Sequence, residues 1–230
     1  MSKIYRDFSR KLRAPLNRHD AFKYLQRFHK KDRDIDEIVD KGINLGTKGL
    51  YRVNSVQKRS EIISLVRHVN NLKPKYVLEI GTYNGGTLFM WANITKNKVV
   101  TCDLRNPPHR AELYKRFPSD TSGCQVITLE GNSHDTKFKE TVHLEFNNAM
   151  VDFLFIDGDH TEIGVEADFN SYSDLVRQGG IIAFHDILKK QPVENNQVYY
   201  FWERVKKNYI YKEFIDDPEQ CGFGIGILYV

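Results

Sequence analysis

The chain has 230 residues, 40% of them hydrophobic and 28% charged, with a net charge of +4, which suits a globular domain with a sizeable core. Its apolar runs are too short to cross a bilayer and no signal-peptide pattern opens it, so we expect neither a membrane-spanning nor a secreted protein. Three cysteines without metal-ligand spacing indicate reduced thiols in a cytoplasmic protein.

The basic charge is concentrated at the start of the chain. Residues 1–33 carry a net charge of +8, which leaves −4 for the remainder. Their apolar residues predict two amphipathic helices, interrupted near Pro15. These residues are Ile4, Phe8, Leu12, Phe22, Leu25 and Phe28. We expect a solvated arm that covers the domain or a partner subunit in a homo-oligomer; the alternative is contact with nucleic acid or an acidic membrane.

Two further segments precede the first strand. Residues 34–56 predict a helix end followed by a glycine-spaced loop, which could form part of a substrate lid. Residues 58–72 predict an amphipathic helix that Pro74 ends. We therefore divide the chain into a basic helical arm with a lid loop, residues 1–56, and a main domain, residues 57–230.

A strand, a glycine turn and a helix follow. Tyr76–Ile80 predicts a buried parallel strand, and a helix is expected from about Leu88. The turn reads Glu79-x-Gly81-x-x-x-Gly85-Gly86, without the middle glycine of the dinucleotide fingerprint G-x-G-x-x-G. It resembles the first motif of class I S-adenosylmethionine-dependent methyltransferases, although a tight turn in another α/β protein is the alternative. The resemblance implies cofactor contacts from Glu79, Gly81, Thr82, Tyr83 and Gly85.

The next two strands also end in polar residues. Lys98–Asp103 predicts a strand whose last residue, Asp103, lies about twenty residues past the glycine turn, where an acid binds the ribose hydroxyls. A helix cap or loop acid is the alternative. Residues 104–122 predict an irregular segment around a short helix at 109–117. Gln125–Glu130 predicts a third strand, after which Ser133 could meet the adenine.

The second half of the chain continues the alternation. Strands are predicted at Val151–Ile156 and Ile181–Phe184, with an intervening helix that Gly179-Gly180 ends. A helix near 198–205 and a hairpin of Tyr211–Ile215 with Phe223–Tyr229 close the chain. The predicted fold is α/β, a doubly wound, Rossmann-like, seven-stranded and mostly parallel sheet with a C-terminal antiparallel hairpin and an N-terminal helical arm.

Three carboxylates follow two neighbouring strands, those of Asp157, Asp159 and Asp186. Unpaired carboxylates in a cleft repel one another, and a hard cation removes that cost. Mg²⁺ prefers oxygen ligands and keeps positions open for water or substrate oxygens. We therefore predict a divalent-metal site beside the cofactor that orients a substrate hydroxyl and lowers its pKa.

Two histidines adjoin these acids. His160, close to such a hydroxyl, is suited to act as a general base, and the alternative is a surface or capping residue. His185 is either a nitrogen ligand, which would favour Mn, Fe or Zn over Mg, or a neighbour that points elsewhere.

Two longer stretches carry a more specific resemblance. Residues 155–169 and 175–187 resemble the macrocin-type sugar O-methyltransferases and the cephalosporin hydroxylase-related methyltransferases, which are metal-dependent relatives of the catechol O-methyltransferases. The resemblance implies Asp157 as a metal ligand that also borders the cofactor, and His160 as the general base. The acidic pair of the family falls on His185 and Asp186, so His185 departs from the pattern. Gln57 falls where related enzymes close over the site.

The combined prediction is a cytoplasmic S-adenosylmethionine-dependent O-methyltransferase, assisted by Mg²⁺ or another divalent cation, that acts on a hydroxyl of a sugar or natural product. One alternative is a nicotinamide-dependent oxidoreductase on a similar sheet, which the missing middle glycine disfavours. The other is a non-catalytic cofactor-binding protein, or a nucleic-acid-binding methyltransferase that uses the basic arm to contact RNA.

Overall fold

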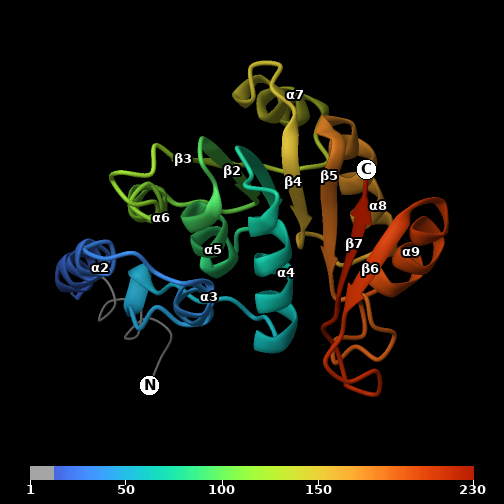
Figure 1. Ribbon diagram of the computed structural model, residues 1–230, viewed down its shortest axis with the longest axis horizontal. Helices are drawn as coiled ribbons and strands as arrows, with labels where there is room; N and C mark the ends of the chain where they lie inside the picture. The colour runs from blue at the N-terminus through green and yellow to red at the C-terminus, as the bar shows by residue number, and fades with distance from the viewer. Residues whose placement is uncertain (1–12) are drawn as a thin grey trace.

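A computed structural model describes residues 13–230 as one twisted sheet with helices on both faces (Figure 1). The strand order is β3-β2-β1-β4-β5-β7-β6. The first five strands are parallel, and β7 is antiparallel to both of its neighbours. The strands are β1 (Tyr76–Ile80), β2 (Lys98–Asp103), β3 (Gln125–Glu130), β4 (Val151–Ile156), β5 (Val176–His185), β6 (Ile210–Phe214) and β7 (Ile225–Tyr229). The predicted doubly wound sheet with its closing hairpin is confirmed.

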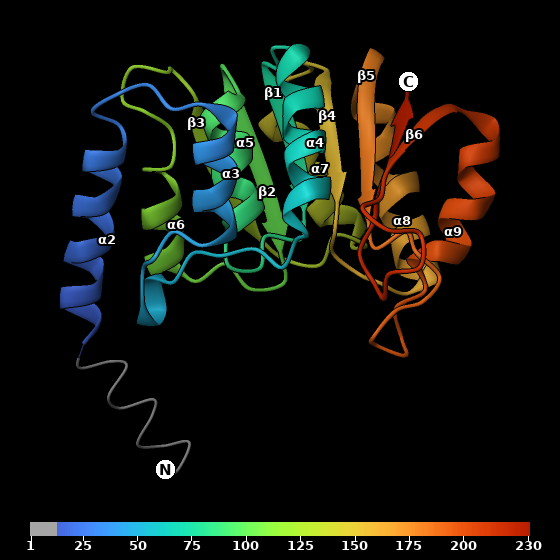
Figure 2. The ribbon, with the colours of Figure 1, turned by 60° about the horizontal axis from the view of Figure 1, so that its bottom comes forward.

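The helices form two layers (Figure 2). One layer contains α2 (Ala14–Phe28), α3 (Ile35–Ile43), α4 (Arg59–Asn71), α5 (Gly86–Ile94) and α6 (Pro108–Tyr114). The other contains α7 (Thr136–Glu145), α8 (Glu162–Tyr172) and α9 (Val198–Val205). Short 3₁₀ turns lie at Gly49–Tyr51, Ser173–Leu175 and Lys206–Asn208. No helix within the described residues is both long and apolar enough to span a membrane.

The strands are apolar on both faces because each face is covered by helices. In β1, Val77 joins the core under α4 and α5, whereas Leu78 and Ile80 join the core under the other layer. This arrangement explains why the central strands read as continuous apolar runs rather than alternating ones. It also directs the carboxyl ends of β1 to β5 to one edge of the sheet.

The sequence prediction was wrong at two segments. Residues 34–56 begin with a complete helix, α3, because Asp34 caps it by accepting a hydrogen bond from the Glu37 amide. Gly179 and Gly180 lie inside β5, which already begins at Val176. The pairing of β4 with β5 shifts register there, and glycines within a strand commonly mark such an irregularity.

The two helices predicted for the basic arm have different outcomes. The first falls mostly on residues 1–12, outside the described residues. The second is α2, where Pro15 occupies the first turn and Leu25 and Phe28 are buried. Helix α3, together with Leu45 and Val53, contributes to the core shared with the sheet.

Candidate active site

A cavity of about 1130 Å³ opens at the carboxyl ends of the parallel strands. Its walls come from the segments that follow β1, β2, β3, β4 and β5, together with two loops outside the sheet. The lining includes residues 54–57, 80–84, 102–105, 131–134, 157–161, 185–186 and 191–193. Ligands of open α/β sheets bind at this edge, so the cavity is the candidate active site.

The glycine turn after β1 forms one wall of the cavity. Gly81 has a φ of +97°, and a Cβ placed there would lie 2.1 Å from the backbone oxygen of Asp157. The turn is held from β2, because Asp103 Oδ2 accepts hydrogen bonds from the amides of Thr82 (3.0 Å) and Tyr83 (2.8 Å). Asp103 therefore fixes the turn and also lines the cavity.

Glu79 lies beneath this turn and is fully buried. Its carboxylate accepts hydrogen bonds from Trp91 Nε1 at 3.0 Å and Thr101 Oγ1 at 2.6 Å. Burial raises the pKa of Glu79 to about 7, against the opposing effect of these hydrogen bonds. The side chain of Glu79 is thus bound to α5 and β2, and Gly85, which precedes α5, packs against Tyr114; neither residue lines the cavity.

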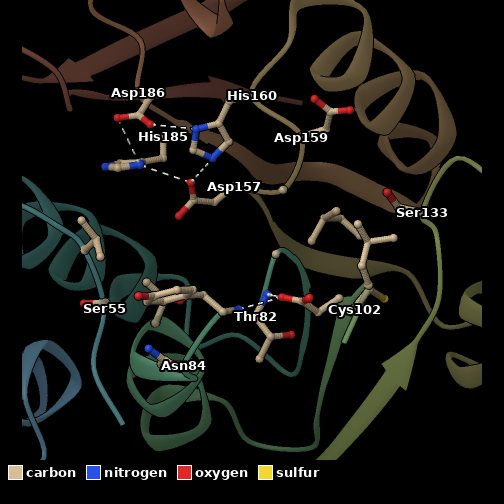
Figure 3. A pocket seen from close by; sticks show the side chains of 18 of the residues that line it. Ser55, Thr82, Asn84, Cys102, Ser133, Asp157, Asp159, His160, His185 and Asp186 are labelled. Atoms are coloured by element: carbon tan, nitrogen blue, oxygen red, sulfur yellow. Dashed lines mark hydrogen bonds and ion pairs between the residues drawn. The ribbon is translucent and has the colours of Figure 1, made fainter. Parts of the chain in front are cut away.

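Three predicted residues meet at the opposite wall (Figure 3). Asp157, His160 and Asp186 each offer a ligand atom, and these atoms lie within 4.8 Å of one another. His160 Nε2 is 3.4 Å from Asp157 Oδ1, and His160 Nδ1 is 3.1 Å from Asp186 Oδ2. Two carboxylates and an imidazole in this arrangement fit a divalent cation.

The electrostatics of this group are dominated by the two carboxylates. Hydrogen bonds to Asp157 and Asp186 raise the pKa of His160 to about 10. Burial opposes ionisation of Asp157, but His185 and His160 hold its pKa well below the usual range. A protonated His160 thus neutralises part of the carboxylate charge.

His185 also faces the two carboxylates and is only 4% exposed. Its Nδ1 lies 3.2 Å from Asp157 Oδ1 and 3.5 Å from Asp186 Oδ1. Burial disfavours the charged imidazole, yet the charge of Asp157 raises the pKa of His185 overall. The side chain therefore points into the group rather than away from it.

Asp159 does not join the group, although the sequence placed it beside Asp157. Figure 3 shows its carboxylate apart from the others, and Asp159 Oδ1 accepts a hydrogen bond from the Thr161 amide at 2.9 Å. This contact belongs to the turn that begins α8. Ser133 lines the cavity away from the carboxylate group, and its backbone oxygen accepts a hydrogen bond from Tyr172.

Side chains from outside the sheet hold the two carboxylates. Gln57 Nε2 donates to Asp157 Oδ2 at 2.9 Å. Asn196 Nδ2 donates to Asp186 Oδ2 at 2.7 Å and lies 3.1 Å from His160 Nδ1. Sequence reasoning missed Asn196, because it lies in a loop whose residues follow no pattern tied to the sheet.

Several polar atoms in the cavity walls lack partners. Within residues 13–230, Ser55 Oγ, Gln57 Oε1 and His185 Nε2 are buried without a hydrogen bond, and all three residues line the cavity. Buried polar atoms are normally satisfied, so a polar ligand group fits against this wall. The residues present therefore suit both an amino-acid-like cofactor end and a cation.

Comparisons with known proteins agree on the fold. Residues 78–187 match a family model described as a methyltransferase domain. An uncharacterized protein of Acanthamoeba polyphaga mimivirus is 32% identical over 112 residues, which are 47% of this chain and 50% of that protein. The chain thus spans about half the length of this relative.

Two solved structures have the same fold. An O-methyltransferase from Bacillus cereus in complex with SAH is 16% identical, with a TM-score of 0.58 over 90% of this chain and 96% of that one. MycE, a methyltransferase from the mycinamycin biosynthetic pathway in complex with Mg, SAH and mycinamycin VI, is 16% identical. Its TM-score is 0.57, over 86% of this chain and 55% of MycE. Residues 78–187 of the protein therefore match the methyltransferase-domain model, and the chain has the fold of these two methyltransferases.

Proposed function

We propose that this protein is an S-adenosylmethionine-dependent O-methyltransferase, assisted by a divalent cation, that methylates a hydroxyl of a small molecule. One observation carries the proposal: the glycine turn with Asp103 and the group of Asp157, His160 and Asp186 face the same cavity. At about 1130 Å³ the cavity exceeds the roughly 300–1,000 Å³ of a pocket for one small ligand, which suits a donor and an acceptor together.

The first part of the proposal concerns the cofactor. S-Adenosylmethionine supplies the methyl group as a sulfonium. We assign ribose binding to Asp103: Oδ2 holds the turn, and Oδ1, which accepts from the Arg105 amide at 3.0 Å, keeps a lone pair for a hydroxyl. We assign Ser133, which lines the cavity, to the adenine end, and the unpaired atoms of Ser55 and Gln57 suit the methionine end. Glu79 and Gly85 act by shaping the turn.

The second part concerns the cation. Mg²⁺ held at this point supplies Lewis acidity that lowers the pKa of the acceptor hydroxyl. Asp157 and Asp186 would hold it, and His185 is directed at the same place through Nδ1. Because an imidazole ligand favours Mn²⁺ over Mg²⁺, the presence of His185 makes Mn²⁺ a strong competitor.

The proton of the acceptor hydroxyl must leave as its oxygen bonds to the methyl carbon and the carbon–sulfur bond breaks. We assign the proton to His160, which lies at the cavity wall beside both carboxylates. With its pKa raised to about 10 it is protonated near neutral pH and cannot accept a proton. If Asp157 and Asp186 held a cation, their charge would no longer keep His160 protonated, so the base function of His160 would depend on cation binding.

The acceptor class follows from the same cavity. A sugar or natural product with neighbouring hydroxyls suits a site with a cation and a base, and the MycE complex with mycinamycin VI supports a small-molecule acceptor. We place the activity in the cytoplasm, which the free thiols of all three cysteines support. The division at residue 56 and an oligomer contact through the basic arm stay predictions.

Calorimetry with SAH and Mn²⁺ tests the proposal. We expect one site for each, and methyl transfer from labelled S-adenosylmethionine to at least one member of a panel of vicinal-hydroxyl compounds. Asp157→Asn should weaken Mn²⁺ binding at least about tenfold and leave SAH affinity within about twofold, because the turn and Asp103 are unchanged. Failure of the wild-type protein to bind SAH would overturn the proposal.

A further inference from the structure

Helix α4 carries a buried carboxylate that the proposed chemistry does not use. Glu61 is 1% exposed and lies in the first turn of the helix. Its Oε1 accepts hydrogen bonds from the Asp216 amide at 3.2 Å and Gln220 Nε2 at 2.7 Å. Its Oε2 accepts one from the Gly224 amide at 2.9 Å. All three donors belong to the loop that joins β6 to β7.

This loop contacts the candidate metal group directly. The Phe223 amide donates to Asp186 Oδ1 at 3.2 Å. Gly222, Phe223 and Gly224 all have positive φ, of 80°, 65° and 81°, and Asp186 itself has a φ of 62°. Side chains rarely adopt such conformations, so Phe223 and Asp186 hold them only while the surrounding contacts are intact. Backbone hydrogen bonds join the loop to the segment after Asp186, from the Ile187 amide to the Gly224 oxygen at 3.3 Å and from the Leu188 amide to the Phe223 oxygen at 3.2 Å. The hydrogen bonds of Glu61 fix the other side of the loop to α4.

The same helix start reaches the other carboxylate. Gln57, two residues before α4, donates to Asp157 Oδ2 at 2.9 Å. Lys58 strengthens the loop attachment through Gln220 Oε1 at 2.6 Å and Asp216 Oδ2 at 2.7 Å. Residues 57–61 thus hold Asp157 directly and Asp186 through the loop.

We propose that Glu61 is a positioning residue: by fixing the 216–224 loop to α4, it sets where Asp186 stands relative to Asp157 and so the affinity of the pair for a divalent cation. The inference rests on the proposed function, because it takes these two carboxylates as cation ligands. Partners behind metal ligands typically change metal affinity about 10–100-fold when they are lost. Glu61 acts one step further out, through the Phe223 amide, so we expect a change near the lower end.

Glu61→Gln is the informative variant, because it keeps the volume of the side chain. An amide has one acceptor oxygen and an NH₂ group, so it cannot accept from both sides of the carboxylate. Either the Gly224 amide or the two donors from Asp216 and Gln220 then lose their acceptor. The loop should loosen at that point while the core around α4 stays packed.

Asp152→Asn is the matched control. Asp152 is 8% exposed and also accepts three hydrogen bonds, from the amides of Lys75 and Tyr76 and from Arg177 Nε. It lies at the start of β4, whereas the cavity lies beyond the end of that strand. Loss of the Asp152 charge should lower the free energy of unfolding without moving the carboxylates of Asp157 and Asp186.

The experiment measures Mn²⁺ and SAH affinity by calorimetry in the wild-type protein and both variants. We expect Glu61→Gln to raise the Kd for Mn²⁺ about tenfold and to change the Kd for SAH less than twofold. Asp152→Asn should lower the melting temperature and leave both affinities unchanged. An unchanged Kd for Mn²⁺ in Glu61→Gln, or an equal rise in both variants, would overturn the inference.

Hydrogen exchange in the cation-free proteins separates this inference from the proposed function. Glu61→Gln should speed exchange of the Phe223 and Gly224 amides at least about tenfold, the equivalent of one lost hydrogen bond, and Asp152→Asn should not. If the wild-type protein bound no Mn²⁺, the cation role would be refuted, and the exchange rates would still decide whether Glu61 holds the loop against Asp186. Unchanged exchange at both amides would refute that contact.

Discussion

The buried carboxylate of Glu79 makes a prediction about how stability depends on pH. Burial raises its pKa from 4.5 to about 7 in the folded protein. The folded state therefore binds more protons than the unfolded state between these two pH values. The contribution of Glu79 to the free energy of unfolding is fully present below about pH 4.5 and is lost as the pH rises through 7. The shift in pKa from 4.5 to about 7 corresponds to a loss of about 3 kcal/mol of unfolding free energy at high pH.

Glu79→Gln removes this loss because an amide does not ionise. Its oxygen can accept from Trp91 Nε1, and its NH₂ group can donate to the hydroxyl of Thr101, which in turn lies 2.6 Å from that of Thr82. Relative to the wild-type protein, we expect the variant to gain about 1 kcal/mol from this effect at pH 5 and about 3 kcal/mol at pH 8.

Urea unfolding of both proteins at pH 5, 6, 7 and 8 measures the difference. Other titrating groups are common to the two proteins, so the change in the difference isolates Glu79. We expect the stability of the variant relative to the wild type to increase by about 2 kcal/mol from pH 5 to pH 8. A difference that stays constant with pH would refute the reasoning, because it would mean that Glu79 has the same pKa in both states.

Two further predictions concern the glycine turn. Asp103→Ala should weaken SAH binding by about 1–3 kcal/mol, measured by calorimetry, since it removes the acceptor of two turn amides and the proposed acceptor of the ribose hydroxyls; unchanged affinity would place the ribose elsewhere. Gly81→Ala should lower the free energy of unfolding by more than about 2 kcal/mol, because its Cβ would lie 2.1 Å from the backbone oxygen of Asp157. Gly123→Ala is the control and should cost about 1 kcal/mol, because the nearest atom, the Lys96 oxygen, is 3.7 Å away. Equal losses in urea unfolding of these two variants would contradict the steric argument.

The sequence was most informative where one rule covers a whole element. The strands are short apolar runs ended by glycines or acids, and parallel strands align their ends, so the meeting of Asp157 with Asp186 could be predicted. The direction in which each side chain points after the strand end could not be predicted. The side chain of Asp157 turns toward His160 and Asp186, and that of Asp159 toward the start of α8, because the local turn decides each direction.

The supporting contacts were least accessible from the sequence. Asn196 reaches Asp186 from ten residues further along the chain and the Phe223 amide from 37 residues further, and Glu61 reads as one more polar residue of an amphipathic helix. Long-range hydrogen bonds of this kind depend on the path of each loop, which hydrophobic periodicity does not encode. The start of β5 was missed for a similar reason, since the paired glycines there look like a helix end.

The first residue of α5 has a consequence for protein engineering. A Cβ at Gly86 would lie within 2.4 Å of the backbone at Gly42, Asn54 and Ser55, so the segment after α3 runs directly across the start of this helix. If residues 75–94 were grafted into another scaffold, the start of α5 would lose the backbone that packs against it at residues 42–55. A library that varies position 86 would select mainly for glycine. The glycine turn, the start of α5 and residues 42–55 therefore have to be transferred together.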